Sequence, residues 1–282
     1  MSATFAETGV LQPQQATLRL IGSLMIGFGV FLSGFVISEP APYELIHVGL
    51  VGFGFLFGLK ISRNVAPLLA LLLVFNVGGF LSLTVMADLA DGPIYLAVTT
   101  FLALTSVFYA AVVEANPARL ALIFNAWTLA AVATSLLGIL GYFHVVPGME
   151  MFTLYDRAKG AFQDPNVFGP FLIAPALYLI HGLLAGRLSG APWRIAGLLI
   201  LSLGVFLSFS RAAWAMLLFC PCLLVMVMLL KERTGAFRLK ILVLSLIAVV
   251  LLFGALAAAL QPEKVASLVS SRAQLEQDYD SG

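Results

Sequence analysis

The chain has 282 residues, of which 61% are hydrophobic and only 10% are charged. Soluble domains contain about 45–50% apolar and about 25% charged residues, so this composition excludes a soluble globular protein and indicates an integral membrane protein. The net charge of +1 gives no electrostatic reason to expect a nucleic-acid partner.

Nine apolar segments follow one another along the chain, and short polar or charged loops separate them. Each is about long enough to cross a hydrocarbon core as a helix, and in lipid only a helix bonds all of its own backbone groups. We therefore predict an all-α fold, a polytopic membrane helix bundle of about nine transmembrane helices over residues 18–260, after a polar tail at residues 1–17. The predicted spans are 18–38, 45–59, 65–86, 94–113, 120–143, 166–185, 195–209, 212–230 and 241–260.

The lysines and arginines are spread unevenly over the loops. A cytoplasmic N-terminus places most of them on the cytoplasmic side and most carboxylates on the outer side, as the positive-inside rule favours. The loop at residues 144–165 and the tail at residues 261–282 then lie outside. Arg157, Lys159 and Arg211 fall on the side that the rule disfavours, and binding of an anion is the simplest explanation.

Asn76 and Asn125 stand within predicted spans, where a polar side chain usually bonds to a neighbouring helix. We predict interhelical hydrogen bonds for both rather than ligand contacts. The sequence contains no nucleotide-binding fingerprint and no metal-binding motif, so we expect neither a cofactor nor a metal ion.

The stretch YDRAKGAFQDPNVFGPFL, residues 155–172, is a polar cluster between two spans, which in a membrane protein is a candidate functional site. Its Asp-Pro-Asn step predicts a helix start, because Asp or Asn caps free amides and proline fits the first turn. A helix N-terminus with basic neighbours favours the binding of an anion. Pro170 and Pro175 predict a kink in this helix. The candidate site residues here are Arg157, Lys159, Gly160, Asp164, Pro165 and Asn166.

A second basic group, Arg211, follows in the segment SFSRAAW between the seventh and eighth spans. One explanation is an interfacial arginine that reaches lipid headgroups. Two basic clusters on one face favour a bound diphosphate instead, since the guanidinium fork matches phosphate oxygens. Aromatic residues near the first cluster predict a belt at headgroup level. They are Phe152, Tyr155, Phe162, Phe168 and Phe171.

At these residues the chain resembles a known family. RAKGAFQDPNVFGPFL is similar to the R-x-x-G-x-F-x-(D/N)-P-N segment of the O-antigen ligase and O-antigen polymerase superfamily, and SFSRAAW is similar to its S-x-SR motif. The tail SRAQLEQDYDSG resembles the start of that family's large periplasmic loop. The three motifs occur in the family's order, and the resemblance covers about residues 60–282.

The resemblance implies an inverting, metal-independent glycan transferase of the bacterial inner membrane. Its donor would be a polyprenyl-diphosphate-linked saccharide held among the membrane lipids. The acceptor would be lipid A-core for a ligase or a second lipid-linked glycan for a polymerase, and the sequence leaves this choice open. Arg157 and Arg211 would contact the diphosphate, with Lys159 as a weaker candidate, while Gly160 and the Asp-Pro-Asn step would shape the site.

The chain also departs from the family's pattern. In the family, a long periplasmic loop beyond this point carries a histidine, the expected base, and further spans follow. None of His47, His144 and His181 matches that histidine, so no catalytic base is assigned. We expect the chain to be truncated just inside this loop, at residues 261–282, and whether it is active without the rest of the loop stays open.

Two other functional classes stay open: a transporter or flippase for a lipid-linked sugar, and a non-catalytic membrane partner of a polysaccharide assembly complex. A transporter favours ionisable residues near the bilayer midplane, whereas the polar residues of interest here lie near span ends. Translocation of the lipid without a new glycosidic bond would indicate the transporter.

Overall fold

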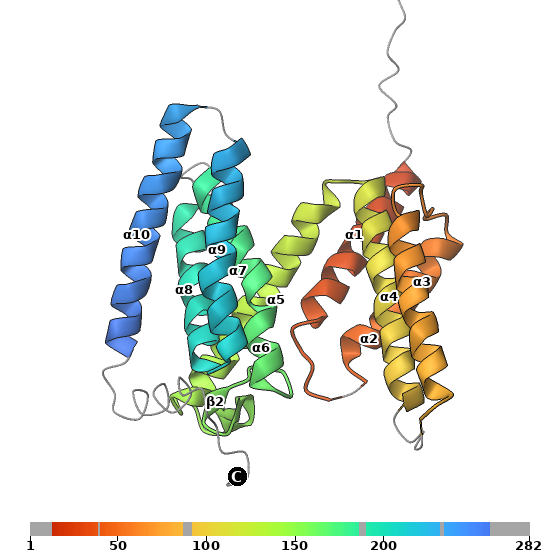
Figure 1. Ribbon diagram of the computed structural model, residues 1–282, viewed down its shortest axis with the longest axis horizontal. Coiled ribbons are helices and arrows are strands. Elements are labelled where there is room, and N and C mark those ends of the chain that lie inside the picture. Colours follow the sequence, from red (N-terminus) through yellow and green to blue (C-terminus); the bar gives the residue numbers. More distant parts are fainter. Residues whose placement is uncertain (1–12, 39, 87–91, 186–189, 232–233, 260–282) are drawn as a thin grey trace, which may run out of the picture. The chain divides into compact units, whose positions relative to one another are not determined.

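The computed structural model describes residues 13–38, 40–86, 92–185, 190–231 and 234–259 (Figure 1). Over these ranges the protein is all-α apart from one small hairpin, and several helices are long and apolar enough to cross a membrane, which indicates a membrane protein. The long apolar stretches are Ala66–Leu83, Gly92–Ala115, Arg119–Tyr142, Pro165–Ala185 and Arg211–Lys231. The predicted tail at 261–282 and most of the tail at 1–17 lie outside the described residues.

The chain divides into two compact units. Unit 1 comprises residues 1–32 and 40–126, and unit 2 comprises residues 33–39 and 127–282. Each predicted span overlaps at least one helix, because a long apolar run in lipid satisfies its backbone hydrogen bonds as a helix.

Unit 1 is built from four helices and the start of a fifth. They are α1 (Pro13–Leu32), α2 (Pro42–Leu56), α3 (Ala66–Leu83), α4 (Gly92–Ala115) and the first part of α5 (Arg119–Tyr142). Helix α1 packs against α2, and α4 packs against both α2 and α3. Many large apolar side chains on α3 and α4 are exposed, as is expected of surfaces that face lipid.

Helix α1 ends at Leu32, whereas the sequence predicted a span that continues to Ser38. The residues after it leave the helical path and join unit 2. There the amide of Val36 donates to the carbonyl of Ala161 at 2.7 Å. This bond to a distant segment replaces the next intrahelical bond, which explains the early end.

A buried histidine bonds to a half-buried tyrosine within unit 1. His47 on α2 is 2% exposed, and its Nδ1 lies 2.7 Å from the carbonyl of Tyr43. Since a carbonyl only accepts, Nδ1 carries the hydrogen, and Nε2 accepts from the hydroxyl of Tyr109 on α4 at 2.5 Å. The pair therefore ties α2 to α4 inside an apolar core.

Tyr109→Phe is expected to lower the free energy of unfolding by about 1–2 kcal/mol, because the buried Nε2 of His47 loses its donor. Unfolding in mixed detergent micelles measures the loss. Tyr95→Phe on the same helix is the control, since Tyr95 is 71% exposed. Equal effects of the two substitutions would contradict a role for this pair.

Asn76 links α3 to α4. Its Oδ1 lies 2.9 Å from the hydroxyl of Thr100, and its Nδ2 donates to the carbonyl of Leu72 at 2.8 Å. The predicted interhelical hydrogen bond is thereby confirmed for Asn76, while that of Asn125 stays a prediction.

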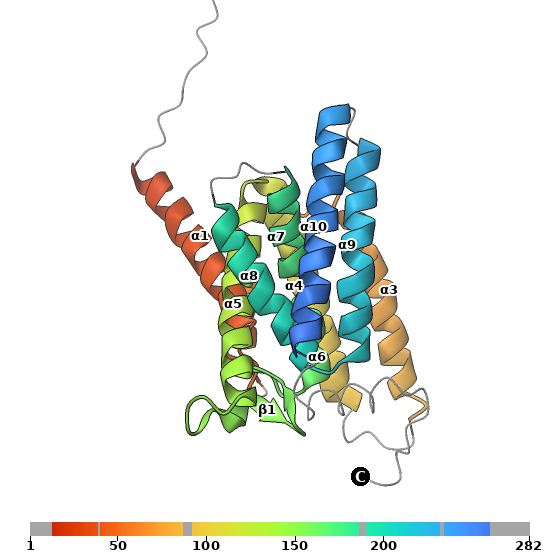
Figure 2. The same ribbon diagram turned by 90° about the vertical axis from the view of Figure 1, so that its left-hand side faces the viewer.

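Unit 2 contains the rest of α5 and the elements that follow it (Figure 2). These are η1 (Met149–Phe152), β1 (Thr153–Leu154), β2 (Arg157–Ala158), α6 (Pro165–Phe171), α7 (Ile173–Ala185), α8 (Ala191–Leu207), α9 (Arg211–Lys231) and α10 (Gly235–Ala259). Helix α7 packs on α8 and α9, α6 packs on the same two helices, and α10 packs on α7 and α9. One apolar cluster, which includes Phe168, Leu172, Leu201 and Leu207, fills the centre.

The sixth predicted span is broken into two helices. Helix α6 ends at Phe171 and α7 begins at Ile173. Pro170 and Pro175 cannot donate backbone hydrogen bonds, which explains the break between the two helices, while the predicted kink stays a prediction.

The predicted loop at residues 144–165 contains regular structure. A short 3-10 helix leads into two antiparallel strands, in which Leu154 pairs with Arg157. Tyr155 and Asp156 form the turn with φ of 49° and 54°. Positive φ at both central residues matches the right-handed twist of a two-residue hairpin, so the turn projects Arg157 back toward the helices.

Candidate functional site

The hairpin, the start of α6 and the start of α9 lie at one end of unit 2 (Figures 1 and 2). Arg157, the first residue of β2, is the link between them. Its side chain is only 7% exposed. Nε donates to the carbonyl of Ser208 at 2.7 Å, and Nη2 donates to Oδ1 of Asn166 at 2.7 Å. The two segments that resembled the family's motifs are thus in direct contact.

The Asp-Pro-Asn step begins α6, as the sequence predicted. Asp164 is the N-cap, and its Oδ1 accepts from the amide of Asn166 at 2.6 Å. Pro165 is the first helical residue and is fully buried. Asn166 therefore uses its amide for the cap and its side-chain oxygen for Arg157.

Gly160 brings the chain close to α5. It has a φ of 56°, and a Cβ there would lie 2.5 Å from Oγ1 of Thr134. That hydroxyl oxygen accepts from the amide of Ala161 at 2.8 Å. Gly160 thus allows the hairpin segment to rest on the buried face of α5.

The turn between α8 and α9 consists of Ser208, Phe209 and Ser210, all of them buried. Phe209 has a φ of 48°, a left-handed conformation that is rare for a bulky residue. The hydroxyl of Ser208 donates to the carbonyl of Val205 at 2.7 Å and lies 3.3 Å from the amide of Ser210. Arg211 follows as the first residue of α9, and its side chain is exposed.

Lys159 is half-buried beside the hairpin. Its amide donates to the carbonyl of Phe152 at 3.0 Å, which closes the hairpin segment onto the 3-10 helix. Of the three basic residues expected to bind an anion, Arg211 is the most exposed, Lys159 is intermediate and Arg157 is buried.

The predicted aromatic belt is wrong for two of its five residues, Phe162 and Phe168. Phe162 is 3% exposed and Phe168 is fully buried, and both belong to the core of unit 2. They pack on each other with ring centroids 6.1 Å apart, and Phe162 also packs on Phe171 at 4.9 Å. Only Tyr155, at 81% exposure, is a strongly exposed member of the set. An aromatic residue near a span end has the same sequence signature whether it faces lipid or the core.

Two supporting residues were not singled out from the sequence. Ser208 holds Arg157 through its carbonyl, and it is the first serine of the SFSR segment. Thr134 holds the amide of Ala161, but it stands in the middle of an apolar helix. The motif could have indicated Ser208, whereas nothing in the pattern of α5 distinguishes Thr134.

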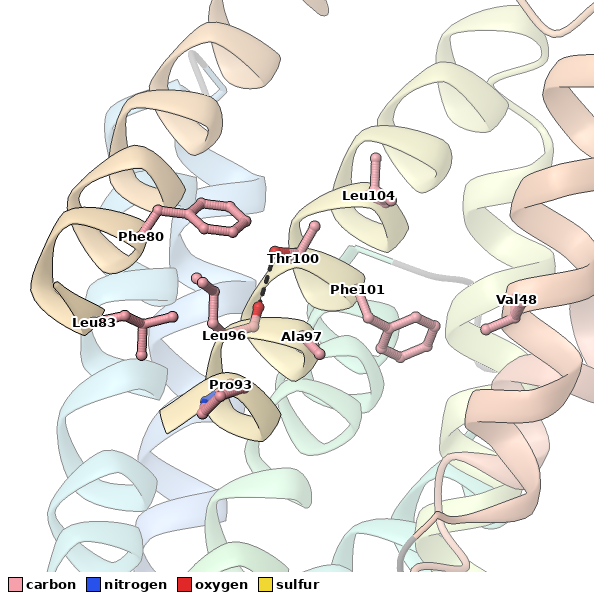
Figure 3. A pocket seen from close by; sticks show the side chains of 9 residues that line it. All are labelled: Val48, Phe80, Leu83, Pro93, Leu96, Ala97, Thr100, Phe101 and Leu104. Atoms are coloured by element: carbon pink, nitrogen blue, oxygen red, sulfur yellow. Dashed lines mark hydrogen bonds between the residues drawn. The ribbon is translucent and has the colours of Figure 1, made fainter. Parts of the chain in front are cut away.

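Unit 1 contains an apolar hollow of about 540 Å³ between α2, α3 and α4 (Figure 3). It is lined by Val48, Phe80, Leu83, Pro93, Leu96, Ala97, Thr100, Phe101 and Leu104. The hydroxyl of Thr100 already bonds to the carbonyl of Leu96 at 2.8 Å, as the dashed line shows. A lining without free polar groups suits an acyl chain better than a sugar or a phosphate.

In the described ranges, no three side chains of His, Cys, Asp or Glu gather as a metal site requires. Compared with known proteins, the chain matches no family model, no curated protein and no solved structure. Function is therefore inferred from the residues of the site.

Proposed function

We propose that the chain is a multi-pass protein of the bacterial inner membrane, of the O-antigen ligase and polymerase type. It transfers or polymerises saccharides linked to polyprenyl diphosphate at the periplasmic face, and Arg211 contacts the diphosphate. The observation that carries the proposal is the bond between Arg157 and the carbonyl of Ser208. It joins the RAKG-to-DPN segment to the SFSR segment and leaves Arg211 exposed beside them.

The charges of unit 2 support this orientation. Helices α8 and α9 are joined at the site end, so the start of α8 and the end of α9 mark the opposite end. That opposite end has Arg194, Lys231, Arg238 and Lys240 among the described residues. The site end has three carboxylates beside its basic residues: Glu150, Asp156 and Asp164. Basic residues favour the cytoplasmic side, so this charge distribution supports a periplasmic location of the site.

The proposed reaction is an inverting substitution. The acceptor hydroxyl oxygen forms a bond to the anomeric carbon while the bond from that carbon to the diphosphate oxygen breaks. The electron pair leaves with the polyprenyl diphosphate, and the hydroxyl proton passes to solvent water. Arg211 stabilises the negative charge that grows on the leaving group, with Lys159 as a second, weaker contact.

Arg211→Ala tests the proposal by glycan transfer in cells that lack their own copy of the protein. The substitution is expected to lower transfer by about 10²–10³-fold, the usual effect of removing one charge-stabilising group, and Arg211→Lys should retain more activity. Arg238→Ala is the control, because Arg238 is exposed on α10 at the opposite end of unit 2.

Unchanged transfer by Arg211→Ala would contradict the assigned contact. If the purified wild-type protein translocates the lipid-linked sugar without forming a new glycosidic bond, the protein is a transporter and the transferase proposal is contradicted. Absence of both transfer and translocation, together with loss of polysaccharide when the protein is deleted, would indicate a non-catalytic partner.

A further inference from the structure

Arg157 is a buried residue whose guanidinium links two segments of unit 2 by hydrogen bonds. The residue is 7% exposed, and two of its five guanidinium hydrogens bond at 2.7 Å to protein acceptors, the Ser208 carbonyl and Oδ1 of Asn166. These lengths are typical of strong, charge-assisted hydrogen bonds. Hydrogens that are committed to protein oxygens in a buried position are poorly placed to meet a ligand.

We propose that Arg157 is a positioning residue that acts through Arg211 and does not itself bind the diphosphate. The inference rests on the proposed function, in which Arg211 is the contact. It reassigns one of the two arginines that the sequence suggested as a diphosphate pair.

The path from Arg157 to Arg211 is short. Arg157 holds the carbonyl of Ser208, whose hydroxyl lies 3.3 Å from the amide of Ser210. Phe209 between them is left-handed, and its side chain is 2% exposed. A bulky residue keeps this conformation only where its surroundings impose it, and the bond to Arg157 is one such constraint. This turn sets the direction of α9, and therefore the position of Arg211, the first residue of that helix.

The second bond of Arg157, to Oδ1 of Asn166, fixes the orientation of the guanidinium. Asn166 stands in the first turn of α6, which is capped by Asp164. Arg157 thus sets the start of α6 and the start of α9 relative to each other. A lysine has one ammonium group on a flexible stem and lacks the planar fork that reaches both acceptors. Arg157→Lys therefore keeps the charge but loses the geometry.

A double-variant cycle tests the inference with a long-chain polyprenyl diphosphate as the probe, bound to the full chain in lipid nanodiscs. Arg157→Lys is expected to weaken binding about tenfold and Arg211→Ala about a hundredfold, and the double variant should equal Arg211→Ala alone because coupled groups are not additive. If the double variant loses a further tenfold, Arg157 is an independent contact and the inference is overturned.

Amide hydrogen exchange of the probe-free protein gives a second measurement that does not depend on the proposed function. Arg157→Lys is expected to speed exchange at residues 208–213 about tenfold, because the turn loses a constraint. Gln163→Ala, an exposed change in the same segment, and Arg211→Ala should not. Unchanged exchange in Arg157→Lys overturns the positioning role.

The two measurements separate the two proposals. Wild-type protein that binds no diphosphate lipid contradicts the proposed function, while the exchange result still decides whether Arg157 holds the turn. If Arg157→Lys does not fold, Asn166→Ala removes one of the two acceptors from a partly solvated position. It should speed exchange at residues 208–213 in the same direction by a smaller factor, and no change there also overturns the inference.

Discussion

Gly160→Ala is expected to lower the free energy of unfolding by about 3 kcal/mol, the sum of a backbone term and an overpacking term. The residue has a φ of 56°, where a Cβ costs about 1–2 kcal/mol. The new methyl group would also lie 2.5 Å from Oγ1 and 2.7 Å from the carbonyl oxygen of Thr134. Thr134 cannot yield easily, since its hydroxyl oxygen accepts from the amide of Ala161.

Gly148→Ala is the matched control for this substitution. Gly148 lies in the same connection and has a φ of 88°, but a Cβ there would meet nothing within 4 Å. It should therefore cost only the backbone term, about 1–2 kcal/mol. Denaturant unfolding of both variants in detergent micelles measures the difference. Similar losses of unfolding free energy in the two variants would mean that the close approach of Gly160 to α5 adds nothing to the cost of the substitution.

Gly169→Ala is expected to cost about 1–3 kcal/mol and to weaken diphosphate binding as well. A Cβ at Gly169 would lie 2.7 Å from Cβ of Ala213 and 2.8 Å from Oγ of Ser208. The methyl group therefore has to push α6 away from the turn that holds Arg157 and from the first turn of α9. Stability and binding should fall together, because one displacement causes both.

Gly254→Ala on α10 is the control for Gly169. A Cβ there meets nothing within 4 Å, and the residue is exposed within a helix. Alanine favours helix over glycine by up to about 1 kcal/mol, so this variant should be neutral or slightly more stable in unfolding experiments. Retained binding in Gly169→Ala would show that the site tolerates separation of α6 from α9.

The sequence predicted most of the helices because their signals are local. Apolar length located the helices of both units, and the Asp-Pro-Asn step located the start of α6. Each of these depends on residues within a few positions of one another. The hairpin escaped prediction because strands of two residues are too short to show an alternating pattern.

The site was predicted only as a set of residues. Charge and spacing drew attention to Arg157 and Arg211, but neither reveals which guanidinium is buried. Burial of Arg157 depends on Ser208, 51 positions along the chain, and on the fold that brings the two together. The support that Thr134 gives to Ala161 likewise spans 27 positions and has no local signature.

The separation of Arg157 and Ser208 along the sequence also has a consequence for biosynthesis. A ribosome that adds about 5–20 residues per second makes Ser208 roughly 3–10 s after Arg157. Until then the guanidinium lacks its buried carbonyl acceptor and has to stay hydrated at the membrane surface, since an unpaired charge is costly to bury. The bond between the hairpin and the turn after α8 can therefore form only after α8 has been made, later than the contact of the hairpin segment with α5. A nascent chain stalled before that point would present an open hairpin to proteases and chaperones on the same side of the membrane.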